Sequence, residues 1–329
     1  MKNFLPASSI TRFLAALAPF GEVHGPVLSD DDVLILGRIE SPAALRLDYQ
    51  RTLLPPKKYL LPPRETVLTY SPDTSYRQSL PTQNFVLLGL HPCDLAGIAY
   101  LDRAFAAAEP DPLYQARRRN LTLIGISCEP DEYCFCTEVG TAVPSIFDLY
   151  MHRAPDGFHI ETGSSRGEKI FAEVAALLEE GECFAAAPLP CGIEGDILAT
   201  ARRGETFPDS RLWDDFAARC LSCGACSLCC PTCYCFDVRE SADLNGETAR
   251  RRREWDNCLF MEFGEVAGGF NFRKSRRERF QYRYQHKYLG FGPVRGIVAC
   301  VGCGRCREVC PVRIDLLELF KGISHDTRS

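Results

Sequence analysis

The chain has 329 residues, of which 46% are hydrophobic and 25% charged, so it is long enough for two domains with hydrophobic cores. Its formal net charge of −5 gives no overall reason to expect binding to nucleic acid or to an anionic membrane. Eighteen cysteines are the unusual feature. Because a chain of this size does not need disulfides to fold, and many of these cysteines recur two residues apart, the composition favours metal ligation in a reducing cytoplasm.

At the N-terminus, Lys2 precedes an apolar stretch that superficially suggests a signal peptide. Pro6 and Arg12 interrupt that stretch. The apolar stripe from Ile10 to Leu17 instead predicts an amphipathic helix of the mature protein. No apolar run reaches the roughly twenty residues that a membrane-spanning helix needs, so we expect no membrane span.

Residues 1–204 carry the patterns of a mixed α/β domain. Short apolar runs predict three strands, at Val33–Leu36, Phe85–Leu90 and Leu121–Ile126. Helices are predicted at Leu95–Phe105 and, from its apolar face, at Lys169–Glu180. Two pairs of prolines bracket Lys57–Leu61, which we expect to be extended and at the surface.

Four cysteines of this domain follow two of the predicted strands. Cys93 comes after Phe85–Leu90, and Cys128, Cys134 and Cys136 come after Leu121–Ile126. Open α/β sheets place ligands beyond the carboxyl ends of their strands, so these thiols could hold a third [4Fe–4S] cluster. The alternative is that they are buried small hydrophobic residues. We favour the cluster, with His91, Asp94 and Glu129 as candidate neighbours that serve equally well as turn or cap residues.

A change of texture around 190–212, where prolines and glycines gather, places a domain boundary near residue 205. Beyond it, strands are hard to find, and the region is rich in Cys and Arg but poor in apolar material. We expect residues 205–329 to consist mainly of short helices and loops that fold around metal.

Two cysteine runs in this second domain have the most specific spacing in the chain. They are Cys220-x2-Cys223-x2-Cys226-x3-Cys230-Pro231 and Cys300-x2-Cys303-x2-Cys306-x3-Cys310-Pro311. Both match the bacterial pattern for two [4Fe–4S] clusters, in which the fourth cysteine of each run ligates the other cluster. We therefore expect cluster 1 to be held by Cys220, Cys223, Cys226 and Cys310, and cluster 2 by Cys300, Cys303, Cys306 and Cys230. Gly224, Gly302 and Gly304 let backbone amides approach the cluster sulfurs.

The predicted fold is therefore α+β with two domains, a mixed α/β domain followed by a mainly helical, dicluster ferredoxin-like domain. Paired zinc ribbons are the alternative, since a C-x2-C pair by itself also suits zinc. Four cysteines in one run followed by proline, found twice, favour iron–sulfur clusters. Such clusters pass single electrons, so we expect an electron carrier that is not catalytic alone.

Four more cysteines of this domain stay open. Cys229 lies next to Cys230, but the spacing and the following proline favour Cys230 as the ligand. Cys233, Cys235 and Cys258 could ligate a further centre, with or without Cys229, or be ordinary thiols.

The insertion between the two runs, residues 231–299, is basic and aromatic. It contains Arg250–Arg253, Trp255, Arg273, Lys274, Arg276, Arg277, Arg279, Arg283 and Lys287, interleaved with Phe280, Tyr282, Tyr284 and Tyr288. Such a stretch can bind nucleic acid. We favour a different role, in which it offsets the negative charge of the clusters and docks on an acidic partner, with the aromatics as core residues.

No G-x-G-x-x-G follows a predicted strand, and neither a Walker loop nor a nucleophile elbow is present. Flavin, nicotinamide and any catalytic metal are therefore expected in other subunits. The other possibilities are a self-contained iron–sulfur or flavin reductase and a nucleic-acid-binding regulator.

Several segments resemble one group of iron–sulfur subunits. They are Cys220-Leu-Ser-Cys-Gly-Ala-Cys, Cys230-Pro-Thr-Cys-Tyr-Cys-Phe-Asp-Val, Ala267-Gly-Gly-Phe-Asn-Phe-Arg, Cys300-Val-Gly-Cys-Gly-Arg-Cys, Leu54-Pro-Pro-Lys-Lys-Tyr-Leu-Leu-Pro-Pro-Arg-Glu, His91-Pro-Cys-Asp and Cys128-x5-Cys134-Phe-Cys136. The group comprises the beta subunit of sulfhydrogenases, which are NAD(P)-linked nickel–iron hydrogenases, the related iron–sulfur subunit of anaerobic sulfite reductase, and the iron–sulfur subunit of heterodisulfide-reductase-linked flavin oxidoreductases.

The resemblance implies a relay role in the cytoplasm. The chain would pass electrons between a flavin subunit that uses NAD(P)H and a terminal redox subunit of hydrogenase, heterodisulfide reductase or sulfite reductase type. The segment Leu54–Glu65 favours the sulfhydrogenase and flavin-oxidoreductase branch over the anaerobic sulfite reductase branch.

Overall fold

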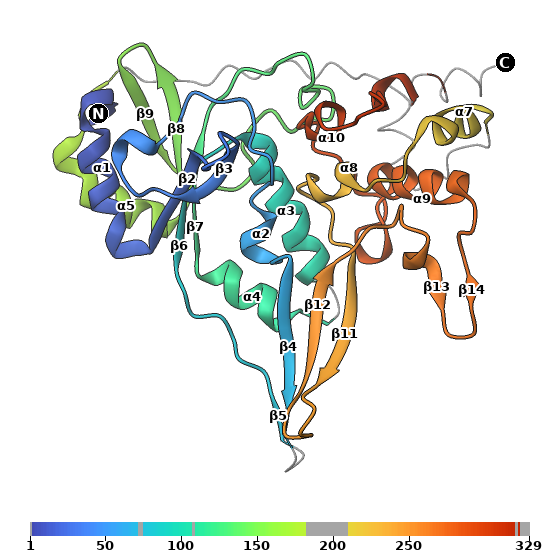
Figure 1. Cartoon of the computed structure of the whole chain (residues 1–329). Coiled ribbons are helices and arrows are strands. Elements are labelled where there is room, and N and C mark those ends of the chain that lie inside the picture. The colour runs from blue at the N-terminus through green and yellow to red at the C-terminus, as the bar shows by residue number, and fades with distance from the viewer. Residues whose placement is uncertain (1, 72–74, 107–108, 182–209, 320–321, 323–329) are drawn as a thin grey trace.

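The computed structural model describes residues 2–319 and 322, apart from 72–74, 107–108 and 182–209. In Figure 1, helices and strands of the N-terminal part lie beside short helices and loops of the C-terminal part, and a long ribbon of strands projects from both. No helix among the described residues is long and apolar enough to cross a membrane. The predicted boundary near residue 205 lies outside the described residues.

An eight-stranded sheet forms the centre of the N-terminal part. In spatial order its strands are β10 (Glu179–Glu180), β1 (Lys2–Pro6), β9 (Gly157–Thr162), β8 (Leu149–Ala154), β7 (Leu121–Ile126), β6 (Phe85–Leu90), β2 (Glu22–Leu28) and β3 (Leu34–Arg38). The middle four strands, from β8 to β2, are parallel, and the outer pairs are antiparallel. The strands predicted at 85–90 and 121–126 are confirmed to the residue, and the one predicted at 33–36 is β3.

Helices cover both faces of this sheet. They are α1 (Ile10–Leu17) and α5 (Ser165–Val174) on one face, and α3 (Pro92–Ala106) and α4 (Pro112–Arg119) on the other. Val86 and Leu88 of β6 pack toward α1 and α5, whereas Leu87 and Leu90 pack toward α3. Burial of both faces explains why β6 and β7 read as unbroken apolar runs.

The predicted helices at 10–17 and 95–105 are confirmed as α1 and α3. The helix predicted at 169–180 starts earlier, at Ser165, because the Ser164 side chain accepts a hydrogen bond from the backbone of Gly167 as an N-cap. It also ends earlier, at Val174, and the chain then continues into β10.

A ribbon of four antiparallel strands joins the two parts of the chain. Its order is β11 (Phe236–Ala242), β12 (Ala249–Trp255), β4 (Arg64–Tyr70) and β5 (Tyr76–Arg77). A short hairpin, β13 (Glu265–Val266) with β14 (Phe270–Asn271), follows. The expectation that residues 205–329 are mainly helical is therefore not confirmed. The run of arginines at 250–253 does not show the apolar alternation of a strand, but Arg251 lies opposite Glu240 and pairs with it across the ribbon.

The prediction of an extended surface segment at 57–61 is wrong. Residues Lys57–Leu60 form the short helix α2, and Lys57 and Leu60 are buried. The preceding proline does not prevent this, because the first turn of a helix leaves its N–H groups unpaired in any case. Lys57 is held inside by two carbonyl oxygens of the cysteine-rich region, those of Ser227 at 3.2 Å and Cys233 at 3.1 Å from its Nζ.

The C-terminal part has its own core beside the cysteine runs. Its helices are α7 (Leu212–Arg219), α8 (Ala225–Leu228), α9 (Arg276–Leu289) and α10 (Arg305–Glu308). Trp213 and Phe216 of α7 pack on Phe280 and Tyr284 of α9, and Cys220 belongs to the same core. Helix α9 begins with a capping box between Ser275 and Glu278, and it forms the floor on which the cysteine loops rest.

Buried charge joins the ribbon to the N-terminal part. Glu65 of β4 pairs with Arg253 of β12, with a distance of 2.7 Å from Arg253 Nε to Glu65 Oε1, and with Arg117 of α4 at 2.6 Å. Arg253 also pairs with Asp111 at 2.5 Å. The Glu65 and Arg253 side chains are both buried.

We predict that Glu65→Ala lowers the free energy of unfolding by about 3–5 kcal/mol, because it leaves two arginines without their carboxylate. Arg64→Ala, one residue away, is the matched control. Arg64 pairs with Glu254 on the exposed surface, so its loss costs less than about 1 kcal/mol. Denaturant midpoints measured anaerobically on both variants test this, and equal midpoints contradict it.

Candidate metal centres

One pocket is lined by the four cysteines predicted for cluster 1, Cys220, Cys223, Cys226 and Cys310. The first three lie between the end of α7 and α8, and the fourth follows α10. Backbone N–H groups approach two of the sulfurs, from Ser222 to Cys220 Sγ at 3.4 Å and from Ile314 to Cys310 Sγ at 3.4 Å. Such donors stabilise sulfur that carries negative charge, so the pocket suits a cluster.

Gly224 sets the shape of the first cysteine loop. Its φ of +79° is in the left-handed region, and a Cβ there would lie 2.3 Å from Nδ2 of Asn257. That same Nδ2 donates to the carbonyl of Gly224 at 2.8 Å, and Asn257 Oδ1 accepts from Ser227 Oγ at 3.0 Å. Sequence reasoning missed Asn257, which no motif signals.

The four cysteines predicted for cluster 2 are also brought together. Burial, and after it the neighbouring Cys230, raise the pKa of the Cys300 thiol to about 12. Burial also raises the pKa of Cys303 and of Cys306, and Cys230 acts on both in the same direction. Because burial opposes an isolated thiolate, these sulfurs carry charge readily only when a metal or cation balances it.

A second pocket is lined by Cys93, Cys128, Cys134 and Cys136, the four cysteines of the predicted third cluster. Cys93 lies in the first turn of α3, Cys128 follows β7, and the other two lie on the loop beyond it. Burial raises the pKa of Cys128 to about 12 and that of Cys136 to about 11. Cys303 lines this pocket as well, so the second and third groups share a wall.

The three neighbours suggested for the third group have different surroundings. His91 lines the pocket and stacks on Tyr49, with ring centroids 4.1 Å apart, and burial lowers the pKa of its imidazole to about 4. Asp94 pairs with Arg305 at 2.8 Å, in full burial. Glu129 is exposed.

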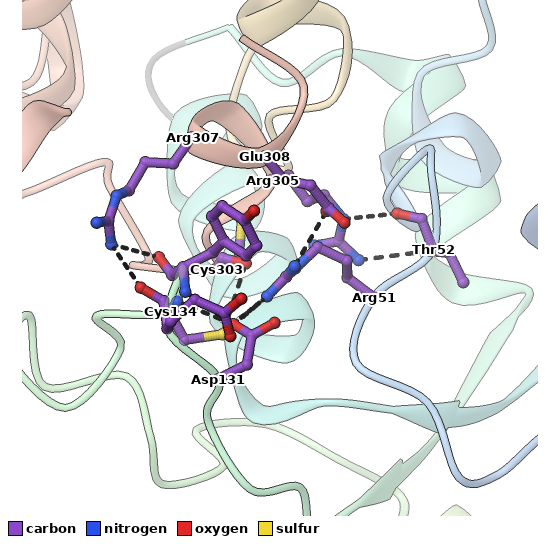
Figure 2. Close-up of polar contacts among 10 residues, drawn as sticks. Arg51, Thr52, Asp131, Cys134, Cys303, Arg305, Arg307 and Glu308 are labelled. Carbon is purple, nitrogen blue, oxygen red and sulfur yellow. Dashed lines mark hydrogen bonds and ion pairs between the residues drawn. The ribbon is translucent and has the colours of Figure 1, made fainter. Parts of the chain in front are cut away.

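Figure 2 shows how arginines lock the third group against the second. Arg51 bonds to Asp131, and its Nη2 lies 3.4 Å from Cys134 Sγ, while Nη1 reaches Glu308 at 3.0 Å. Arg305 donates to the carbonyl of Thr52 at 2.9 Å. Sequence reasoning missed these residues; the position of Arg305 inside the second cysteine run was the one available signal.

Backbone contacts complete this junction. Phe135 N donates to Gly302 O at 2.8 Å, and Thr141 Oγ1 donates to Val301 O at 2.7 Å. Arg307 Nη1 donates to the carbonyl of Tyr133 at 2.9 Å. The loop of the third group is therefore built directly onto the second cysteine run.

A row of buried cations lies under the cysteine loops. Arg279, Arg283 and Lys287 are four residues apart on α9, so they share one face. Their side chains donate to Leu259 O at 2.9 Å, Cys226 O at 2.6 Å and Thr232 Oγ1 at 3.0 Å, respectively. Being buried, they are withdrawn from any nucleic acid, which supports the charge-balancing role over nucleic-acid binding.

The four remaining cysteines do not form one group. Cys229 lies beside Cys226, Cys230 and Cys303. The thiol of Cys235 instead makes hydrogen-bonding contact with those of Cys233 and Cys258. Among the residues that the structure describes, no three His, Cys, Asp or Glu side chains converge closely enough to hold a single metal ion.

Comparison with known proteins agrees with this arrangement of thiols. Residues 219–314 match the family model described as a 4Fe-4S dicluster domain. Sulfhydrogenase 2 subunit beta of Pyrococcus furiosus is 37% identical over 325 residues, which cover 94% of each chain. The chain belongs to the sulfhydrogenase beta-subunit family. As a member of that family it is an iron–sulfur subunit that functions in electron transfer.

No solved structure matches this sulfhydrogenase-type beta subunit. The dicluster domain accounts for the two cysteine runs, and the resemblance read from the sequence is confirmed. The pocket formed by Cys93, Cys128, Cys134 and Cys136 lies outside the residues matched by the domain.

We predict that Gly302→Ala disrupts the junction of the second and third groups. Gly302 has φ +61°, and an added Cβ would lie 2.5 Å from the backbone of Phe135 and Cys136. Gly246→Ala is the control, since it has a similar φ of +72° and open space around it, so it carries the same backbone strain without the overlap. Iron content per chain should fall in Gly302→Ala and stay unchanged in Gly246→Ala; equal iron contents contradict the prediction.

Proposed function

We propose that this subunit relays single electrons between a flavin subunit that uses NAD(P)H and a terminal redox subunit, within a cytoplasmic oxidoreductase complex. The observation that carries the proposal is the adjacency of three groups of four thiols. Cys306 of the second group also lines the pocket of the first, and Cys303 also lines the pocket of the third. The second group therefore lies between the other two.

The proposed ligands follow the crossed pattern of two-cluster ferredoxins. Cluster 1 would be held by Cys220, Cys223, Cys226 and Cys310, cluster 2 by Cys300, Cys303, Cys306 and Cys230, and a third [4Fe–4S] cluster by Cys93, Cys128, Cys134 and Cys136. When bound, these clusters would supply one-electron redox chemistry at three neighbouring positions.

The side chains around the thiols support such centres in two ways. The cations of α9, together with Arg51 beside Cys134, place positive charge next to sulfur, which favours the reduced, more negative state of a cluster. The aromatic residues Tyr284 and Tyr288 are buried and exclude water from the thiols of the first and second groups. Cys223 and Leu221 are exposed, so the first group reaches the surface, where a partner can approach.

The crossed ligation predicts which variants resemble each other. Cys310→Ser and Cys220→Ser should alter the same electron paramagnetic resonance signal of the reduced protein, although the two residues lie in different cysteine runs. Cys300→Ser is the control and should alter a different signal, one that it shares with Cys230→Ser. Loss of separate signals in Cys310→Ser and Cys220→Ser would refute the crossed assignment.

The relay role predicts that the isolated chain has no turnover of its own. Purified alone and tested with NAD(P)H and an artificial electron acceptor, it should be inactive and contain no flavin, and activity should return when the flavin subunit is added. Robust turnover by the isolated chain would instead favour the self-contained reductase.

Proteins that purify with the chain decide the terminal partner. The similarity to a sulfhydrogenase beta subunit leads us to expect a nickel–iron hydrogenase subunit. A siroheme subunit in its place would favour the anaerobic sulfite reductase branch, and a heterodisulfide reductase would favour the third branch.

A further inference from the structure

We propose that Cys233, Cys235 and Cys258 bind a further iron–sulfur cluster, a fourth centre beside the three of the proposed relay. The inference rests on the proposed function, because it adds a centre to the same electron-transfer subunit. It arises from three observations: the contact between the three thiols, the buried cations that face them, and the absence of a site for a single ion among the described residues.

The ribbon brings the three thiols together. Cys233 and Cys235 lie between α8 and β11, and Cys258 follows β12, so the hairpin of β11 and β12 returns the chain to the same point. At the base of this hairpin, Phe236 pairs with Trp255, and Asp256 N donates to Cys235 O at 3.0 Å. Cys233 and Cys258 are almost completely buried, and Cys235 contacts both.

Three buried cations face this trio of thiols. Lys57, Arg283 and Lys287 are each at most 5% exposed. Among the described residues, none of the three forms an ion pair with a carboxylate, and the Nε of Arg283 has no hydrogen-bond partner. A buried charge is normally paired, so an anionic group belongs beside them. The charges that act on all three include the thiol of Cys233.

The first two clusters do not account for all of this positive charge. Arg283 lies beside Cys226 of the first group, and Lys287 lies beside Cys230 of the second. Lys57, which reaches in from α2, is influenced most by Cys233, and its Nζ donates to the carbonyl of that same residue at 3.1 Å. Lys57 is therefore the cation that a centre at Cys233 would need.

The arrangement favours a cluster over a single zinc ion. Zinc in a structural site takes four ligands that converge on one point, and the described residues contain no such convergence. An iron–sulfur cluster presents its irons at separated positions, which suits thiols spread over three chain segments. Three cysteines are the ligand set of a three-iron cluster, or of a four-iron cluster whose last iron takes a different ligand. Cys229 is not included, because it lies toward Cys226, Cys230 and Cys303.

The iron content of the full-length chain, purified anaerobically, tests the proposal without any variant. Four centres predict about 15–16 irons per chain with matching acid-labile sulfide, whereas the three-cluster relay predicts about twelve. A value of twelve overturns the fourth centre and leaves the relay intact; iron-free protein overturns both.

Two matched pairs of variants locate the extra centre. Cys235→Ala should lose three or four irons per chain, whereas Cys229→Ala, another buried cysteine of the same segment, should keep all of them. Full iron in Cys235→Ala overturns the proposal, as does loss of one zinc in place of iron.

The second pair keeps every thiol, so it serves even where a cysteine variant fails to fold. Lys57→Met should lower the reduction potential of one centre, because it removes a cation beside it. Lys58→Met is the control, since Lys58 Nζ bonds to Leu36 O at 2.5 Å and lies away from the thiols. A redox titration monitored by electron paramagnetic resonance that shows the same potentials in both variants contradicts the proposal.

Discussion

Buried positive charge facing sulfur is the interaction on which the rest of this structure depends. Helix α9 carries Arg279, Arg283 and Lys287 along one buried face, and Lys57 enters from the N-terminal part. A buried ion without a partner costs several kcal/mol, so this arrangement is stable only when the neighbouring thiols are negatively charged. Burial opposes that charge unless metal holds the sulfur. Folding of the C-terminal part and binding of metal are therefore coupled.

The same constraint explains why the N-terminal and C-terminal parts cannot be treated separately. The sheet places Cys93 and Cys128 at the carboxyl ends of β6 and β7, but the pocket that they line is closed by Cys303 from the second cysteine run. Arg305 reaches back to Asp94, and β12 pairs with β4. The spacing between the thiol groups is set by this packed junction and the ribbon, which do not act as a flexible linker. A relay benefits from that rigidity, because electron transfer depends steeply on distance.

Local patterns predicted the elements whose environment is uniform. Strands β6 and β7 were found to the residue because both of their faces are buried, which leaves an unbroken apolar run. Patterns failed where distant contacts decide the outcome. Residues Lys57–Leu60 were expected to be extended between prolines, yet they form a helix whose lysine is buried against the cysteine loops. Likewise, β12 is a strand because its arginines meet carboxylates on β11 and β4, which the order of residues along the chain does not reveal.

The sequence by itself determined the two ferredoxin-type cysteine runs and the family, because ligands of one cluster follow a fixed local spacing. It also placed four further cysteines after two strands, since strand ends meet at one edge of a sheet. Only the tertiary structure decided which thiols lie together. It separated Cys229 from the trio of Cys233, Cys235 and Cys258, and it set Cys303 beside the third group. The physical reason is that such neighbours come from segments far apart in the chain, and their contact depends on how the sheet, the ribbon and α9 pack against one another.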